Sequence, residues 1–406
     1  MPAPPLVALD LGTSRVRALV GEPRDDGHLM ITGIGEHRSL GIRKGEVTDF
    51  DNALACVRSA LQDAEEQADV DIRSVLLAFS GGRVRSEVNR GTVHVLNPGG
   101  EITPREMQSV AVAAKTVTLP PERLVVHTIQ QRYHVDGQEG VTNPAGMEAR
   151  QLSLDMLVVH GRESLLHNLV RVVRSANVDV EDAAFGGLCS ALAVLTREQK
   201  RNGALLVDLG GGTTNYLAYA RQCVAAAGSI SVGGDHVTND LALGLRIPTT
   251  QAERLKLQHA AAVPVPEAQY QSISLPAEGG FPGRTIRLAD VHAIAHARLD
   301  ETLEMVKAEV DRLDLLHHFG AGVVLTGHGA LVARVGDLVE RVFRLPCTIG
   351  KPRDVSGLAV VTGGPEYAAA VGMLRYGQST TQRGGGAGNL LDRLFGIIRG
   401  GGGSGS

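Results

Sequence analysis

Two segments of the chain share one pattern, an aliphatic strand that ends in Asp and then turns through Gly and Thr. Residues 6–14 read LVALDLGTS, and residues 205–214 read LLVDLGGGTT. A second apolar run follows each segment, which predicts two β-hairpins. Because Asp10 and Asp208 stand about half the chain apart, we interpret the chain as a duplicated α/β architecture. Chance similarity between two short strand ends is the alternative at this point.

Strand and helix patterns alternate around the two hairpins, and a separate unit interrupts the first half. The first half is expected to hold a strand at 29–34, a helix at 51–68, a strand at 74–79, a helix opening at Thr103-Pro104 in a capping box, strands at 124–135 and 152–159, and helices at 164–176 and 187–195. The second half is expected to hold a helix near 236–245, an irregular stretch at 263–282, a long helix at 288–316, a strand and turn at 322–329 followed by a helix, a strand at 346–350, and a helix at 365–376.

The composition excludes several classes of protein. With 406 residues the chain is too long for a single core, so two or more domains are expected. A formal net charge of −4 and an aromatic content of 3% argue against a nucleic-acid partner. The four cysteines form no C-x-x-C pair, and the N-terminus shows no signal-peptide pattern. We therefore expect a cytoplasmic protein with reduced cysteines.

The turns after Asp10 and Asp208 predict a phosphate-binding site. A Gly/Thr turn exposes backbone N–H groups and hydroxyls, so two facing turns are suited to hold a polyphosphate. The two carboxylates are the oxygen ligands that a hydrated Mg2+ prefers, and we expect them to bind that ion through water. No Walker A sequence occurs in the chain.

The ordered motifs resemble the actin, heat-shock chaperone and sugar kinase superfamily, and within it the FtsA family of bacterial cell-division proteins. The resemblance implies an α/β, actin-like (ribonuclease H-like) fold with duplicated domains around a nucleotide cleft, an FtsA-type 1C subdomain and a C-terminal amphipathic helix. The segments that carry it are 9–13, 41–45, 138–144, 185–188, 207–213 and 321–327.

The resemblance also implies the nucleotide-binding residues. They are Asp10, Gly12, Thr13 and Ser14 in the first phosphate loop, Asp208, Gly210, Gly211, Gly212, Thr213 and Thr214 in the second, and Gly233, Gly234, Glu253, Lys256, Gly327, His328 and Gly329 around the ribose and adenine. Two positions depart from the family pattern, which usually has Asp where this chain has Asn215, and a Gly-Gly doublet where His328 intervenes. With both departures, ATP binding is still expected, but rapid ATP hydrolysis is not. We therefore expect that the protein is not an enzyme, or is at most a slow ATPase.

The family pattern divides the chain into four subdomains and a tail. Subdomain 1A is expected at 1–83 and 163–200, the inserted subdomain 1C at 84–162, subdomain 2A at 201–240 and 319–377, subdomain 2B at 241–318, a flexible tether at 378–388, an amphipathic membrane helix at 389–399 and a disordered end at 400–406. By resemblance, the C-terminal peptide of the tubulin-like protein FtsZ docks on subdomain 2B, other division proteins bind subdomain 1C, and the chain polymerises with itself.

The tail segment separates into two faces on a helical wheel. Apolar side chains gather on one face, and Asp392, Arg393, Gly396 and Arg399 lie on the other, which is typical of a helix that lies in a membrane interface. Docking on its own domain or on a partner's groove is the alternative. The residues expected to bind anionic lipid are Leu390, Leu391, Arg393, Leu394, Phe395, Ile397, Ile398 and Arg399.

The function expected from these features is that of an ATP-binding, actin-like protein that polymerises. Such a protein would tether FtsZ filaments to the cytoplasmic face of the membrane at the division site and recruit further division proteins. A phosphotransferase or a pilus-assembly ATPase of the same superfamily is the alternative, but neither explains the insert and the amphipathic tail together.

Overall fold

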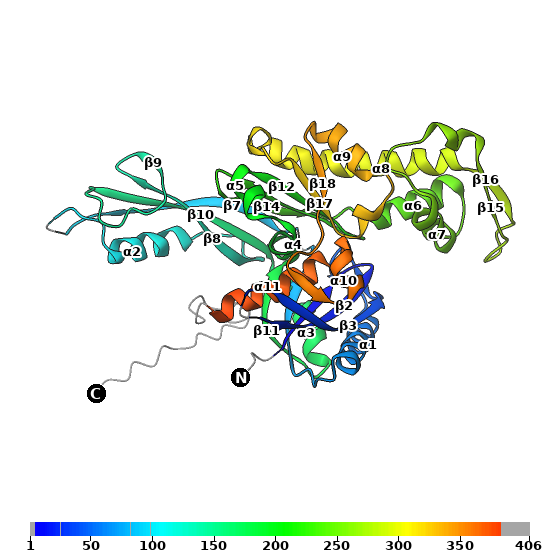
Figure 1. Ribbon diagram of the computed structural model, residues 1–406, viewed down its shortest axis with the longest axis horizontal. Helices are drawn as coiled ribbons and strands as arrows, with labels where there is room; N and C mark the ends of the chain where they lie inside the picture. The colour runs from blue at the N-terminus through cyan, green and yellow to red at the C-terminus, as the bar shows by residue number, and fades with distance from the viewer. Residues whose placement is uncertain (1–4, 25, 82, 98, 383–406) are drawn as a thin grey trace.

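The computed structural model describes residues 5–24, 26–81, 83–97 and 99–382, and its two central sheets repeat one topology (Figure 1). The first sheet contains β1 (Leu6–Leu11), β2 (Arg15–Pro23), β3 (Leu29–Arg38), β6 (Ser74–Phe79), β11 (Asp179–Phe185) and β19 (Val355–Gly357). The second contains β12 (Ala204–Leu209), β13 (Thr214–Ala220), β14 (Cys223–Ile230), β17 (Val323–Thr326) and β18 (Cys347–Ile349).

The strand order β11-β6-β1-β2-β3 of the first sheet corresponds to β18-β17-β12-β13-β14 of the second. In both, the strand with Asp as its penultimate residue opens an antiparallel meander and pairs on its other side with a parallel strand. The predicted duplication and the actin-like α/β fold class are therefore confirmed, and chance similarity of the two hairpins is excluded.

Glycines let the helices of the first domain pack closely on its sheet and on one another. This domain contains α1 (Phe50–Ala68), α3 (Glu163–Ser175), α4 (Gly186–Val194), α10 (Ala359–Gly363) and α11 (Ala368–Gln382), whereas α5 (Arg197–Asn202) contacts β13 of the second sheet. A Cβ added to Gly35 of β3 would lie 1.8 Å from the carbonyl oxygen of Ala60 in α1. Similarly, a Cβ on Gly372 of α11 would lie 1.7 Å from the carbonyl oxygen of Cys189 in α4. Glycine is therefore required at both helix contacts.

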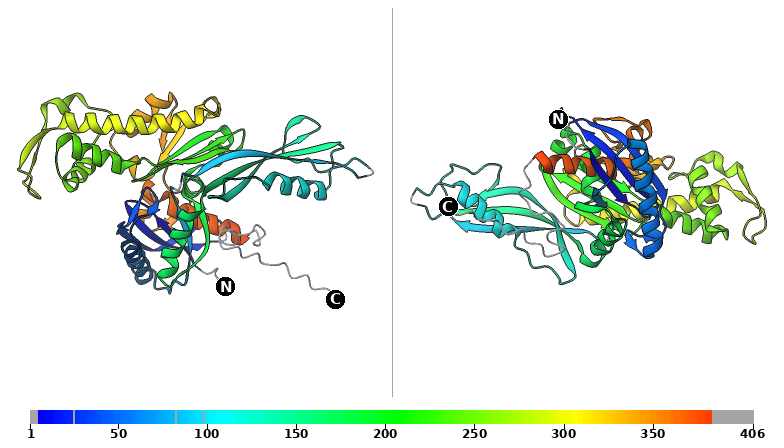
Figure 2. Two further views of the ribbon diagram at one scale, coloured as in Figure 1. Left: turned by 180° about the vertical axis from the view of Figure 1, so that it is seen from behind. Right: turned by 90° about the horizontal axis from the view of Figure 1, so that it is seen from below.

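The insert projects from one end of the molecule as a sheet with its own helix and core (Figures 1 and 2). Its elements are β7 (Arg85–His94), α2 (Pro104–Lys115), β8 (Arg123–Val135), β9 (Gln138–Val141) and β10 (Gln151–Arg162). The predicted capping box is confirmed, because the Thr103 backbone N–H donates to Glu106 Oε2 at 3.0 Å and α2 begins at Pro104. The root of the insert also bonds to the second domain, where Ser229 N–H donates to the carbonyl of Val84 at 3.0 Å.

The opposite end of the molecule is a helical lobe with a small hairpin (Figure 1). It contains α6 (Gly234–Leu245), α7 (Thr249–His259), β15 (Ser272–Leu275), β16 (Arg284–Arg287) and α8 (Leu288–Asp311), while α9 (Val335–Phe343) covers the second sheet. Two expectations were wrong here. The stretch 263–282 is not irregular throughout, since it holds a 3-10 turn at Pro266–Tyr270 and strand β15. The long helix ends at Asp311, and a 3-10 turn follows at Leu316–His318.

The C-terminal helix is longer than expected. Helix α11 continues to Gln382, so residues 378–382 of the predicted tether are helical. The remainder of the tether, the amphipathic segment 389–399 and the end 400–406 lie outside the described residues. Within the described residues, no helix combines the length and apolar character needed to cross a bilayer.

Candidate functional site

The two predicted phosphate loops have the same backbone geometry and lie opposite each other. Gly12 N–H donates to the carbonyl of Arg15 at 3.1 Å, and Gly210 N–H donates to the carbonyl of Thr213 at 3.0 Å. These bonds close the turn between β1 and β2 and the turn between β12 and β13. The duplicated sequence pattern therefore folds into a duplicated turn.

The tips of the two loops meet across the interface between the domains. A Cβ on Gly211 would lie 1.8 Å from Ser14 Oγ, and a Cβ on Gly212 would lie 2.5 Å from Thr13 Oγ1. Only glycine permits this approach, which leaves backbone N–H groups and hydroxyls side by side. The residues present therefore fit a phosphate-binding cradle.

Asp10 lies at the base of the first loop with a cation beside it. The carboxyl is buried, and its cross-strand partner on β2 is Arg17. Burial raises the pKa of Asp10 to about 6, the charge of Arg17 opposes the rise, and the charge of Asp208 adds to it. Arg17 is itself buried and donates to Glu36 Oε2 at 2.8 Å.

Asp208 holds the corresponding position below the second loop, but its partners are neutral. Ser190 Oγ on α4 donates to Asp208 Oδ2 at 2.8 Å, and the cross-strand partner on β13 is Asn215. Burial raises the pKa of Asp208, while the hydrogen bonds from Ser190 and Asn215 and, last, the charge of Arg17 oppose the rise. Asn215 Nδ2 also donates to Ser80 Oγ at 2.9 Å, and its buried Oδ1 has no hydrogen-bond partner in the described part of the chain.

This polar base fits a hydrated cation. Two buried carboxylates with raised pKa values, Asp10 and Asp208, influence each other electrostatically, and an unsatisfied amide oxygen lies beside them. Mg2+ binds carboxylate oxygens and keeps most of its water, so a hydrated Mg2+ could satisfy all three groups.

The first residues of α6 form hydrogen bonds to the backbone of the second phosphate loop. Gly234 N–H donates to the carbonyl of Gly210 at 2.9 Å, and Asp235 N–H donates to the carbonyl of Gly211 at 2.8 Å. A Cβ on Gly233 would lie 2.5 Å from the carbonyl oxygen of Gly210. These first amides of α6 are thus bonded to the loop.

Thr213 and Thr214 are both buried, and Thr214 supports the loop rather than opening onto the cleft. Its side chain is fully buried, and its hydroxyl donates to the carbonyl of Val232 at 2.8 Å. This bond ties β13 to the segment that leads into α6.

Glu253 and Lys256 form one network on α7. Lys256 Nζ lies 2.7 Å from Glu253 Oε2 and donates to the carbonyl of Gly234 at 3.2 Å. Glu253 also accepts a hydrogen bond from the hydroxyl of Thr238. The pair therefore joins α7 to the start of α6, beside the second phosphate loop.

The segment Gly327–Gly329 packs against the end of β12. Gly327 has φ of 82°, and a Cβ there would lie 2.3 Å from Asp208 Oδ1, while a Cβ on Gly329 would lie 2.3 Å from Leu209 Cγ. Packing alone thus requires both glycines. His328 opens the 3-10 turn His328–Leu331, and its buried Nδ1 has no hydrogen-bond partner in the described residues. Burial first, and then the charge of Arg17, lower the pKa of His328.

A cavity of about 290 Å³ opens at the phosphate loops. One wall comes from the turn between β4 (Ile42–Arg43) and β5 (Glu46–Val47), and the other from the first turns of α6. The residues that line it are Thr13, Arg43, Lys44, Gly212, Asp235, His236 and Asn239.

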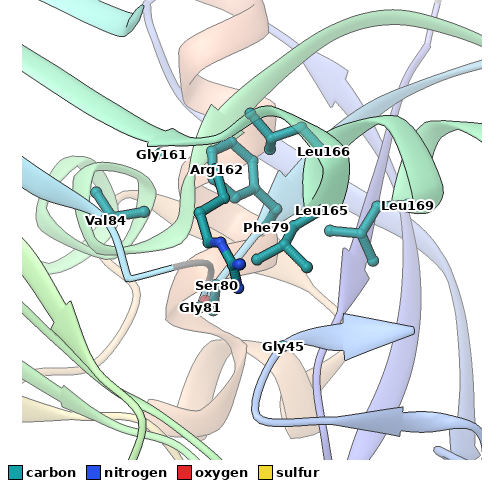
Figure 3. A pocket seen from close by; sticks show the side chains of 10 residues that line it. All are labelled: Gly45, Phe79, Ser80, Gly81, Val84, Gly161, Arg162, Leu165, Leu166 and Leu169. Carbon is teal, nitrogen blue, oxygen red and sulfur yellow. The ribbon is translucent and has the colours of Figure 1, made fainter. Parts of the chain in front are cut away.

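A second hollow lies at the root of the insert and is too small for a ligand. Its volume is about 10 Å³, which is about the space of a single water molecule. Figure 3 shows its mainly apolar side chains around the end of β6 and the start of α3. The residues that line it are Gly45, Phe79, Ser80, Gly81, Val84, Gly161, Arg162, Leu165, Leu166 and Leu169.

Four residues of the site were not singled out from the sequence as nucleotide contacts. Arg17 and Ser190 are buried beside the two aspartates, and Arg43 and Lys44 line the cavity. A charged residue inside the apolar run of β2 was the available signal for Arg17. No local signal marks Ser190, because its role depends on how α4 packs against the second sheet.

The paired sheets and facing glycine loops define an actin-like protein. Two solved structures share this fold. The PilM-PilN type IV pilus biogenesis complex has a TM-score of 0.61 at 15% identity, covering 92% of this chain and 98% of that chain. MreB5 of Spiroplasma citri, solved bound to ADP, has a TM-score of 0.54 at 14% identity, covering 93% and 97%. Both likenesses concern the fold alone.

Within this class, the sequence comparisons identify the family. Residues 205–372 match the family model "Cell division protein FtsA", and residues 81–160 match "SHS2 domain inserted in FTSA". The cell division protein FtsA of Pseudomonas aeruginosa is 35% identical over 372 residues, covering 92% of this chain and 89% of that protein. The chain belongs to the FtsA family of cell-division proteins.

Proposed function

We propose that this chain is an ATP-binding, polymerising member of the FtsA family that tethers FtsZ filaments to the cytoplasmic face of the membrane. The observation that carries the nucleotide part is the contact of Gly211 and Gly212 with Ser14 and Thr13, because it builds one phosphate cradle from two domains. MreB5 of Spiroplasma citri, which shares this fold, is solved bound to ADP, and this supports a nucleotide ligand for the present chain.

The bound species proposed is Mg2+-ATP. Asp10 and Asp208 would hold the ion through water, and Gly12, Thr13, Gly211 and Gly212 would hold the phosphates. The ion would offset phosphate charge at the base of the cleft, where both carboxyls are buried. Glu253 and Lys256, beside the start of α6, would contact the ribose and adenine.

Slow turnover is part of the proposal. Asn215 gives the base of the second loop an amide where the family usually has a carboxylate, so a potential general base is absent from that position. Nucleotide binding would then act on assembly, and hydrolysis would not be the purpose of the site.

Membrane attachment is proposed for the segment 389–399, whose apolar and polar faces separate. One short helix with a net charge of +1 binds lipid weakly, and a polymer that presents many copies would bind by avidity. The proposed partners are anionic lipid, the FtsZ C-terminal peptide on subdomain 2B, further division proteins on subdomain 1C and other copies of the chain.

Electron microscopy on a lipid monolayer tests these parts together. With Mg2+-ATP, the full chain is expected to form filaments on the monolayer and to recruit added FtsZ. A chain that ends at Gly388 is the matched control, and it should bind ATP normally and leave the monolayer bare. Equal lipid binding by both chains would refute the membrane role, and rapid steady-state ATP hydrolysis would refute the non-enzymatic role.

A further inference from the structure

The turn between β4 and β5 brings two cationic side chains to the cavity at the phosphate loops. Arg43 and Lys44 are exposed and line one wall, and neither forms an ion pair within the described residues. Across the cavity, Asp235 is the only carboxylate among the lining residues, and it accepts a hydrogen bond from Ser14 Oγ at 3.5 Å. The lining therefore carries an excess of positive charge, which favours an anionic ligand.

The turn is held rigidly in this place. Lys44 and Gly45 both have left-handed backbones, with φ of 51° and 74°. A Cβ on Gly45 would lie 1.9 Å from the carbonyl oxygen of Ser80, so the turn is pressed against the end of β6. Gly45 N–H donates to Thr13 Oγ1 at 3.1 Å, which binds the turn to the first phosphate loop.

The same turn reaches the second phosphate loop. The backbone nitrogen of Lys44 lies 2.9 Å from the position that a Cβ on Gly212 would occupy. The charge of Lys44 also reaches α6, where burial first and then this charge lower the pKa of His236. Lys44 is therefore close to elements of both domains.

The position of the cavity indicates which part of a nucleotide it takes. Its lining includes one residue from each phosphate loop, Thr13 and Gly212, but neither Lys256 nor His328 from the proposed adenosine end. A volume of about 290 Å³ is at the lower limit of small-molecule pockets, so it suits part of a nucleotide. That part is the outer end of the phosphate chain.

We propose that Arg43 and Lys44 bind the terminal phosphate of a nucleoside triphosphate and distinguish it from a diphosphate. The inference rests on the nucleotide binding proposed above and names its outer-phosphate subsite. Because the turn contacts both loops, a phosphate held there would join Arg43 and Lys44 of the first domain to Gly212 of the second. With a diphosphate bound, Arg43 and Lys44 would have no terminal phosphate to bind.

The test measures affinity for ATP, a non-hydrolysable ATP analogue and ADP by calorimetry, in the presence of Mg2+. Lys44→Met and Arg43→Met are each expected to weaken binding of ATP and its analogue about tenfold. Binding of ADP should change less than about twofold. Lys115→Met, which removes an exposed cation on α2 of the insert, is the matched control and should change neither affinity.

The ratio of the ATP and ADP affinities decides whether the inference holds. An ATP-to-ADP affinity ratio equal to that of the unmodified chain in both variants would overturn the inference, whether both affinities fall or neither does. If the unmodified chain binds neither nucleotide, the proposed function fails together with the inference. Lys44→Arg should restore the preference for ATP, and unchanged thermal unfolding without nucleotide would show that the variants are folded.

Discussion

The two phosphate loops share a backbone but differ in the groups that surround their aspartates. Both turns close with the same hydrogen bond, from Gly12 to Arg15 and from Gly210 to Thr213. Asp10 faces a cation across its strand pair, whereas the residue opposite Asp208 is a neutral amide. A duplicated backbone has thus acquired two different electrostatic environments.

This comparison shows that the duplication determines the backbone of the two phosphate loops but not the charges around their aspartates. Close approach requires glycine at the loop tips, so the backbone is constrained in both halves. The charges below the tips are set by side chains from other elements, namely Glu36 on β3 beside the first loop and Ser190 on α4 beside the second. We expect the first loop to depend on charge pairing and the second on neutral hydrogen bonds.

The largest expected effect comes from making the first loop resemble the second. Arg17→Asn would leave Glu36 without its 2.8 Å partner and Asp10 without its neighbouring cation. Arg17 is buried, but the side chain of Glu36 is 24% exposed and keeps Arg15 nearby, so we expect the free energy of unfolding to fall by about 3 kcal/mol, the lower end of the range for buried charge pairs. Chemical denaturation of the nucleotide-free chain measures it.

Arg15→Asn is the matched control for this change. Arg15 lies 3.5 Å from the other oxygen of Glu36, but its side chain is 44% exposed, compared with 8% for Arg17. An exposed pair contributes about 0–1 kcal/mol, so this variant should differ little from the unmodified chain. Equal losses in the two variants would contradict the buried role of Arg17.

The environment of Arg17 also marks the limit of what the sequence predicts. The hairpins, their duplication and the capping box at Thr103 follow from local patterns of glycine, aspartate and apolar residues, and the structure confirms them. Arg17 donates to Glu36, and its Cζ lies 5.1 Å from the ring centroid of Tyr367. These partners are far from Arg17 along the chain, so no local sequence pattern predicts the contacts.

The helix predicted at 288–316 shows a related limit. Residues after Asp311 have helix-forming side chains, yet the chain turns at Asp314, whose φ is 54°. The next residue, Leu315, packs partly buried against the core of the second domain. Tertiary packing therefore ends the helix where propensity alone would continue it.

The second prediction concerns the pH dependence of the first loop. Asp10 has a folded-state pKa of about 6, above its ordinary value of 3.8. The unfolded chain therefore releases this proton at lower pH than the native chain, and the carboxyl increasingly destabilises the native state as pH rises from about 4 to 6. Asp10→Asn should remove this effect and stabilise the nucleotide-free, metal-free chain by up to about 3 kcal/mol at pH 7.5.

Chemical denaturation of both chains at several pH values measures the difference in their free energies of unfolding, and the values at low pH are the control. The stability difference between Asp10→Asn and the unmodified chain should be small near pH 4 and reach its maximum above pH 6. A difference that does not vary with pH would show that the carboxyl of Asp10 is not the destabilising group. The same substitution should weaken Mg2+-dependent ATP binding, because it removes a proposed ligand of the ion.

The smallest expected effect comes from a substitution at Gly233, which contacts the second phosphate loop. Gly233→Ala would place a Cβ 2.5 Å from the carbonyl oxygen of Gly210 and 2.6 Å from that of Gly211. The backbone at Gly233 is extended, so the added carbon rather than the conformation causes the clash. Both contacts are to backbone, so the loop must shift, and overpacking of this kind costs about 1–3 kcal/mol. ATP affinity should fall with it, since the shifted loop no longer faces Thr13 and Ser14.

The neighbouring glycine provides the control for that substitution. A Cβ on Gly234 would lie 3.7 Å from the nearest atoms, the carbonyl oxygen of Gly210 and Lys256 Nζ, which is ordinary van der Waals contact. Gly234→Ala should therefore keep the stability of the chain and lower ATP affinity less than Gly233→Ala does, although it alters the same turn of α6. If the two variants bind ATP equally well, the position of the second loop is not what holds the phosphates, and the first loop with its cations would carry the binding.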